Sequence, residues 1–130
     1  MDMIEKVTEL LTRLEAATGP DRELDAMLHV HASDGRLTEY DRYGWVKGPA
    51  DIGEAPPVTA SVDAALALCE RVLPDRLRDF REVLDSDKGR VWVAWLSAYD
   101  GTSVSADAPT LPLALLTALV RALQHRRAGS

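Results

Sequence analysis

The chain has 130 residues and a single cysteine, Cys69, which excludes an internal disulfide and a cluster of cysteine metal ligands. Cys69 lies in an apolar segment with helical periodicity, where we expect a small buried core residue rather than a nucleophile. The first 14 residues alternate charged and apolar side chains, so they lack the apolar run of a secretory signal peptide. These absences favour the cytoplasm as the location.

Long apolar runs and an excess of basic charge are also missing. The longest apolar segment, 111–123, is too short to span a membrane and contains Pro112 and Arg121. The 15 Lys and Arg residues are outnumbered by 21 Asp and Glu residues, which gives a net charge of −6. Because nucleic acids favour a basic surface, the sequence predicts a protein that binds neither nucleic acid nor membrane.

The residues that are present predict one α+β domain over 1–130, with an ordered core from about 3 to 126. Apolar residues recur every three or four positions in three segments, which predicts helices, and Ser61 is the expected N-cap of the third. A fourth helix is expected to begin with Thr110 as its cap and Pro112 in its first turn. Three segments rich in β-branched and aromatic residues predict strands. The expected helices are 3–17, 20–31, 62–73 and 110–126, the expected strands are 36–46, 90–98 and 102–106, the Pro- and Gly-rich segment 47–57 is an expected flexible loop, and 124–130 is an expected frayed tail.

Segment 76–84 fits two patterns. Leu77, Phe80 and Leu84 have helical spacing, whereas Phe80, Glu82 and Leu84 share one face of a strand. Segment 90–98 is apolar nearly throughout, which is typical of a strand that is covered on both faces.

Three phrases occur in a fixed order along the chain: LEAATGPDRELDAML at 14–28, VTASVDAALAL at 58–68 and TLPLALLTALVRAL at 110–123. Together they resemble the phage α/β/α-sandwich (ABA sandwich) domain, a family of phage and prophage proteins. The resemblance implies a phage or prophage origin, and therefore a bacterial host cell. It also implies a three-layer α/β/α sandwich, in which a mixed or antiparallel sheet of about four strands has helices on both faces, and it favours a strand over 76–84.

The last predicted helix is apolar on nearly every side, so it must be covered on more than one side. One interpretation is a homo-oligomer whose interface contains Leu113, Leu116, Val120 and Leu123. The alternative is that the first helix covers this surface within one chain.

Catalytic motifs are absent, because the chain has no glycine-rich phosphate loop and no Ser–His–Asp signature. Asp25 and His29 lie four residues apart and form the best pair for a small hydrolase, with His29 as a general base. The favoured interpretation of His29 is a histidine stabilised by the helix dipole. His29 and His31 have metal-ligand spacing on a strand, but on a helix they point roughly 200° apart. We therefore expect no enzyme activity, no metal and no cofactor.

Aromatic residues precede the expected loop and suggest a ligand site. Tyr43 and Trp45 alternate onto one strand face, where the pair is expected either to stack on a base or to receive a protein partner, and Tyr40 is a further candidate ligand-binding residue. Arg42 and Arg90 would contact phosphate through their planar guanidinium groups.

Three functions follow as expectations. The first is a non-catalytic accessory protein that sequesters a small, nucleotide-like host signal to counter host defence, at an oligomer interface. The second is an adaptor or inhibitor that binds a host protein through the acidic surface and the loop 47–57. The third is the small hydrolase that uses Asp25 and His29.

Overall fold

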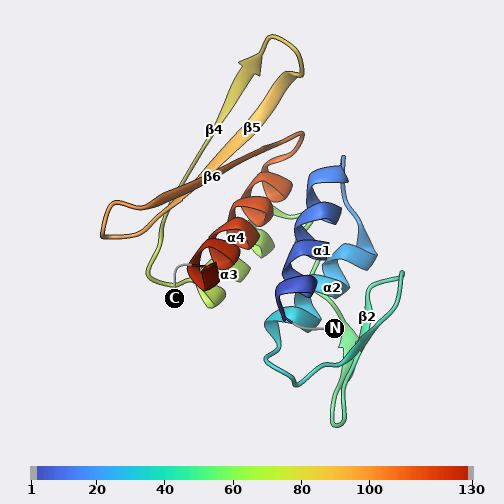
Figure 1. Cartoon of the computed structure of the whole chain (residues 1–130). Helices are drawn as coiled ribbons and strands as arrows, with labels where there is room; N and C mark the ends of the chain where they lie inside the picture. Colours follow the sequence, from blue (N-terminus) through green and yellow to red (C-terminus); the bar gives the residue numbers. More distant parts are fainter. Residues whose placement is uncertain (1–2, 129–130) are drawn as a thin grey trace.

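The computed structural model describes residues 3–128, and within them it contains four helices and six strands (Figure 1). The strands form two antiparallel three-stranded sheets, in the orders β1-β2-β3 and β4-β5-β6. The helices are α1 (Met3–Ala16), α2 (Arg22–Ala32), α3 (Val62–Val72) and α4 (Leu111–Ala128), and the strands are β1 (Glu39–Tyr40), β2 (Trp45–Lys47), β3 (Ile52–Glu54), β4 (Leu77–Asp85), β5 (Gly89–Ser97) and β6 (Ser103–Ala108).

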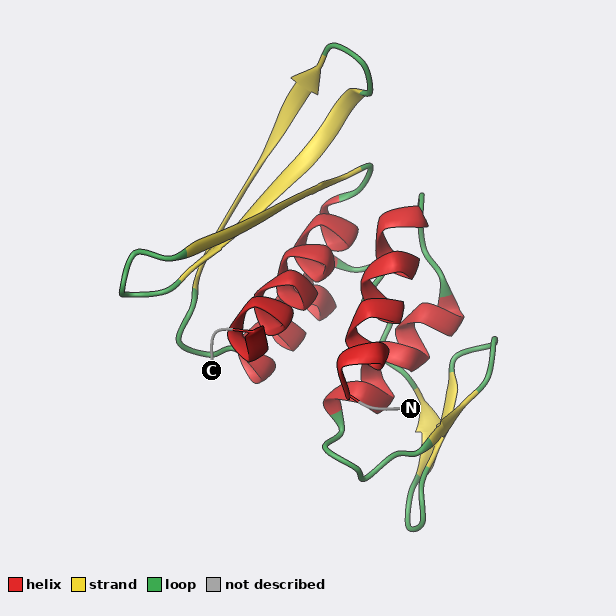
Figure 2. Cartoon of the chain, in the orientation of Figure 1, coloured by secondary structure: helices red, strands yellow, loops and turns green. Residues whose placement is uncertain are grey.

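The helices lie between the two sheets (Figure 2). The sheet β4-β5-β6 packs on α4, and α4 also packs against α1 and α3. On the far side, α2 packs on α1 and contacts β1 and β2 of the small sheet. The predicted α+β class is therefore confirmed. In place of one central sheet of about four strands with helices on both faces, the chain forms two separate sheets that flank the helices.

Helices cover one face of the sheet β4-β5-β6. On β5, Ala94 and Leu96 point into the core, and Trp92 packs against it. On the opposite face, no helix of residues 3–128 covers Trp95, which instead has the Arg81 guanidinium 5.2 Å from its ring centroid. At Trp95 this second face is therefore covered by a side chain of the sheet itself and not by a second layer of helices. Long charged side chains can cover apolar surface with their methylene groups, as a helix covers it with its apolar face. A run of apolar residues in the sequence therefore does not show which of the two covers a strand.

Most of the apolar surface of α4 is buried by other elements of the same chain. Leu113, Leu116 and Val120 are buried in the core, and Leu123 is half-buried against the same cluster. These residues were expected in an oligomer interface. They instead lie inside one chain, because β5, β6, α1 and α3 surround α4. The helix also continues to Ala128, beyond the expected start of a frayed tail at 124; residues 129 and 130 lie outside the described chain.

The segment expected to be one strand, 36–46, forms β1 and β2 with a turn between them. The segment expected to be a flexible loop, 47–57, contains β3, which pairs with β2 in antiparallel register. The prolines of this segment lie before and after β3 and not within it. The Pro and Gly content of all eleven residues therefore predicted a loop, although three of them form a strand.

Other expectations hold. Segment 76–84 lies in β4, so the strand interpretation is confirmed. Ser61 caps α3, because its side chain accepts a hydrogen bond from the Ala64 N–H. Cys69 is buried in the core, and burial raises the pKa of its thiol to about 11, so it is protonated and unreactive at neutral pH.

Gly48 gives the first prediction, because it allows the β2–β3 turn to lie against the segment before β1. A Cβ atom on Gly48 would lie 1.9 Å from the backbone oxygen of Arg36, whereas a Cβ on Gly53 in β3 meets nothing within 4 Å. We expect Gly48→Ala to lower the free energy of unfolding by about 1–3 kcal/mol, because the backbone must move apart. Gly53→Ala is the matched control and should change this free energy by less than about 0.5 kcal/mol. Urea unfolding measures both, and equal values for the two variants would contradict the close approach at Gly48.

Candidate functional site

The exposed large apolar side chains gather in two places. Of the eight in the described chain, four lie on or beside the small sheet and four on or beside the β4–β5 hairpin. The first group consists of Tyr40, Tyr43, Trp45 and Ile52, and the second of Leu77, Phe80, Leu84 and Tyr99. We call the outward face of β1-β2-β3, with Trp45 and Ile52 at its centre, the small-sheet surface.

Strand alternation fixes which residues form this surface. Val46 points inward and is buried with Ala26, Leu37 and Ala55 in a small apolar cluster beneath the sheet. Its neighbours Trp45 and Lys47 therefore point outward. Lys47 pairs with Ile52 on β3, so Ile52 shares the outer face. The side chains border a hollow of about 390 Å³, whose lining also includes Glu39, Tyr40 and Asp41.

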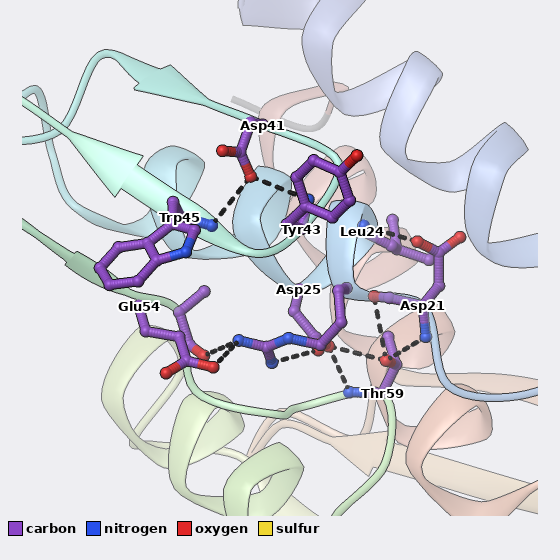
Figure 3. A network of polar contacts seen from close by, with 10 residues as sticks. Asp21, Leu24, Asp25, Asp41, Tyr43, Trp45, Glu54 and Thr59 are labelled. Atoms are coloured by element: carbon purple, nitrogen blue, oxygen red, sulfur yellow. Dashed lines mark hydrogen bonds and ion pairs between the residues drawn. The ribbon is translucent and has the colours of Figure 1, made fainter.

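A turn separates the two aromatic residues that were expected to act together. The Asp41 carboxylate accepts hydrogen bonds from the backbone N–H groups of Tyr43 (2.8 Å) and Trp45 (3.1 Å). Gly44 follows Tyr43 with a φ of +96°, a conformation that favours glycine. The Tyr43 and Trp45 rings consequently point to different sides of the turn (Figure 3). Their expected alignment on one strand face is wrong, because the strand is interrupted between them.

Arg22, at the start of α2, joins the helix to the small sheet. Its Nη1 donates to Asp25 at 2.7 Å, and its Nη2 donates to Glu54 at 3.1 Å and to the backbone oxygen of Ala55 at 2.8 Å. Gly44 lies against the same guanidinium, since a Cβ there would come within 2.6 Å of it. One side chain thus holds α2, the 41–44 turn and the end of β3 together.

The Asp25 carboxylate is buried, with only 1% of the residue exposed. One oxygen accepts from Arg22, and the other accepts from the backbone N–H and the hydroxyl of Thr59, both at 2.7 Å. The Thr59 hydroxyl also accepts from the Asp21 N–H. A buried carboxylate is tolerated when its oxygens are paired and hydrogen-bonded in this way.

His29 does not share this carboxylate. Within residues 3–128, the hydrogen bonds of Asp25 go to Arg22 and Thr59 and not to His29. Burial lowers the pKa of His29, and the positive charges of Arg71 and Arg36 lower it further. The candidate catalytic pair therefore lacks its orienting carboxylate. The described chain also contains no group of three acidic, His or Cys residues that fits a metal ion.

Four of the five expected ligand-binding residues lie together. Tyr40, Arg42, Tyr43 and Trp45 lie on the small sheet or its turn, where the Arg42 guanidinium is 5.1 Å from the Tyr43 ring centroid. Arg90 lies on β5, at the other end of the molecule, where it pairs with Glu82 at 3.3 Å (Figure 1). Sequence analysis missed Arg22, Glu54 and Thr59, whose contacts join segments more than 30 residues apart.

A second hollow, of about 780 Å³, lies between α1, α2 and the segment that leads into β1. Its lining mixes apolar residues, such as Met27 and Leu37, with charged residues, such as Lys6 and Asp34. Tyr40 borders both hollows, so the small sheet separates them.

Comparison of the chain with protein-family models, curated proteins and solved structures finds no match. Within residues 3–128, no helix has the length and apolarity needed to cross a membrane.

The Arg22 contacts give the second prediction. We expect Arg22→Lys to lower the free energy of unfolding by about 1.5–3 kcal/mol, because a single ammonium cannot reach Asp25, Glu54 and the Ala55 oxygen together. Arg42→Lys makes the same chemical change in the adjacent turn, where the guanidinium only stacks on Tyr43, and should cost less than about 0.5 kcal/mol. Urea unfolding compares the two variants. Equal stabilities would show that Arg22 does not anchor the sheet.

Proposed function

We propose that the chain is a non-catalytic protein-binding module of the bacterial cytoplasm, of phage or prophage origin, and that it acts as an adaptor or inhibitor. The observation that carries this proposal is the exposure of Trp45 (52%) and Ile52 (75%) on one anchored face. Protein interfaces are centred on such aromatic and aliphatic side chains, which lose contact with water when the partner binds.

Charged residues surround these two apolar side chains. Glu39, Asp41, Lys47 and Glu54 lie around the small-sheet surface, which matches the polar rim of protein interfaces. The surface is also held in place before any partner arrives, by the buried Val46 cluster and by Arg22. A preorganised surface loses little conformational entropy on binding.

A protein partner fits this surface better than the nucleotide-like signal does. The residues that line the hollow include two acidic ones, Glu39 and Asp41, and one basic one, Lys47, so phosphate would meet net negative charge. Of the two arginines expected to contact phosphate, Arg90 lies away from this surface and pairs with Glu82, and Arg42 stacks on Tyr43. With a net charge of −6, the chain favours a partner that carries basic side chains around an apolar patch. A hydrolase has less support, because the Asp25 carboxylate accepts hydrogen bonds from Arg22 and Thr59 and does not orient His29.

The third prediction tests the surface directly. The tagged chain is used to capture proteins from a bacterial lysate, beside Trp45→Ala and Tyr99→Ala. Tyr99 is the control because it is more exposed than Trp45 but lies after β5, in the second apolar group. We expect a partner that the wild type and Tyr99→Ala retain and that Trp45→Ala binds at least roughly tenfold more weakly.

Equal capture by all three proteins, or capture of nothing specific, would contradict a protein partner at this surface. Native mass spectrometry of the purified chain completes the test. A retained nucleotide of a few hundred daltons would contradict the proposal and support sequestration instead.

A further inference from the structure

The strand β4 is an open edge of the larger sheet. In the order β4-β5-β6 it pairs on one side only, and over 77–82 every residue is exposed (Figure 1). Leu77, Phe80 and Leu84 are among the exposed large apolar side chains of the molecule. A long strand with unpaired backbone groups is a template for pairing with another strand.

A side-chain contact shows which backbone groups of β4 face outward. The N–H of Phe80 donates to the carboxylate of the adjacent Asp79 at 2.9 Å rather than to β5, so it lies on the open edge. Backbone groups alternate along an antiparallel strand, so those of Arg78 and Glu82 face the same way. The side chains of these three residues lie on the helix side of the sheet, because their β5 partners include the buried Ala94 and Leu96.

The sequence of β4 complements itself in one antiparallel register. When a twofold axis passes through the sheet at Phe80, this residue lies opposite Phe80 of a second copy. Arg78 then lies opposite Glu82 of that copy, and Asp79 opposite its Arg81. Leu77 lies opposite Val83. Over 77–83 every facing pair is therefore apolar with apolar or acidic with basic, and such cross-strand pairs stabilise a sheet.

Neighbouring registers lack this property. Moving the axis to Arg81 sets Arg81 against Arg81 and Phe80 against Glu82. Moving the axis to Asp79 sets Asp79 against Asp79 and Arg78 against Phe80. Like charges directly opposite one another are destabilising. Charged residues usually prevent edge strands from pairing, but here their spacing selects a second copy of the same strand and a single register.

We infer that two copies of the chain pair through β4 and form one continuous six-stranded sheet with a twofold axis at Phe80. In this dimer Arg78, Phe80 and Glu82 each form a backbone hydrogen-bonded pair, which gives about six hydrogen bonds between the two copies. The Asp79 carboxylate releases the Phe80 N–H and turns to Arg81 of the second copy. The small-sheet surface lies at the far end of each copy and stays free (Figure 1).

Sedimentation equilibrium tests the dimer. The wild-type chain should show a concentration-dependent species of twice its 14.2 kDa mass. Phe80→Pro removes an N–H that faces away from β5 and should leave the chain monomeric and folded, because proline is tolerated at such a position on an edge strand. Circular dichroism checks that the fold is intact.

Charge reversal tests the register. Arg78→Glu sets two acidic residues opposite each other at both symmetric positions, and Glu82→Arg sets two basic residues there. Each single variant should raise the dimer dissociation constant at least roughly tenfold. The double variant should return this constant to the wild-type value, because acidic and basic residues again lie opposite each other. The double variant has the same composition as the wild type, so restored pairing cannot reflect net charge.

A wild-type chain that is monomeric at every concentration would overturn the inference. A dimer that persists in Phe80→Pro and in both single reversals would also overturn it, because its interface would then lie away from β4.

Discussion

The whole molecule depends on one constraint, which is that α4 is apolar on nearly all of its sides and must be removed from water on all of them. Its first ten residues, from Leu111 to Val120, are buried without exception. The sheet β4-β5-β6 provides one wall, and α1 and α3 provide the others. Since these elements occupy the surroundings of α4, α2 and the small sheet are placed outside them. The functional surface is therefore peripheral to the core rather than part of it.

That peripheral position explains why the small sheet needs a polar anchor. The apolar cluster beneath it contains only Ala26, Leu37, Val46 and Ala55, with Val30 packed against it. Such short side chains bury little area, and the hydrophobic contribution scales with buried area. The contacts of Arg22 with Asp25, Glu54 and Ala55 supply the remaining constraint. They fix the direction in which Trp45 faces, and they connect the stability of α2 to the binding surface.

Local signals in the sequence predicted local structure. The Ser61 cap, the apolar run of β5 and the helical periodicity of α1 each depend on neighbouring residues, and each is confirmed. What covers each face was not predictable, since the same apolar run is compatible with a helix or with a long charged side chain, such as Arg81 over Trp95, as its cover. The anchor of the small sheet was also hidden. Arg22 and Glu54 are 32 residues apart, and a contact of that span leaves no periodic pattern. Arg90 was grouped with the aromatic residues by chemistry alone, and the fold places it at the opposite end.

The two exposed apolar surfaces follow from the same constraint. With residues 111–120 of α4 covered within one chain, the surplus apolar residues lie at the ends of the molecule, on the small sheet and on the β4–β5 hairpin. The self-association that we propose therefore uses a strand edge, and residues 111–120 of α4 belong to the core. In this arrangement the dimer and the partner-binding surface use different residues and can be occupied together.

The central claim is that a single chain buries α4 without help from a second copy. Hydrogen–deuterium exchange followed by mass spectrometry, at a dilution where sedimentation shows only monomer, measures this most directly. We expect the amides of 111–123 to exchange more slowly than those of the small sheet and of the β4 edge, because the core surrounds α4 on every side. If these amides instead exchange in the monomer as rapidly as the exposed β4 edge, α4 is covered by a second subunit and the account is wrong.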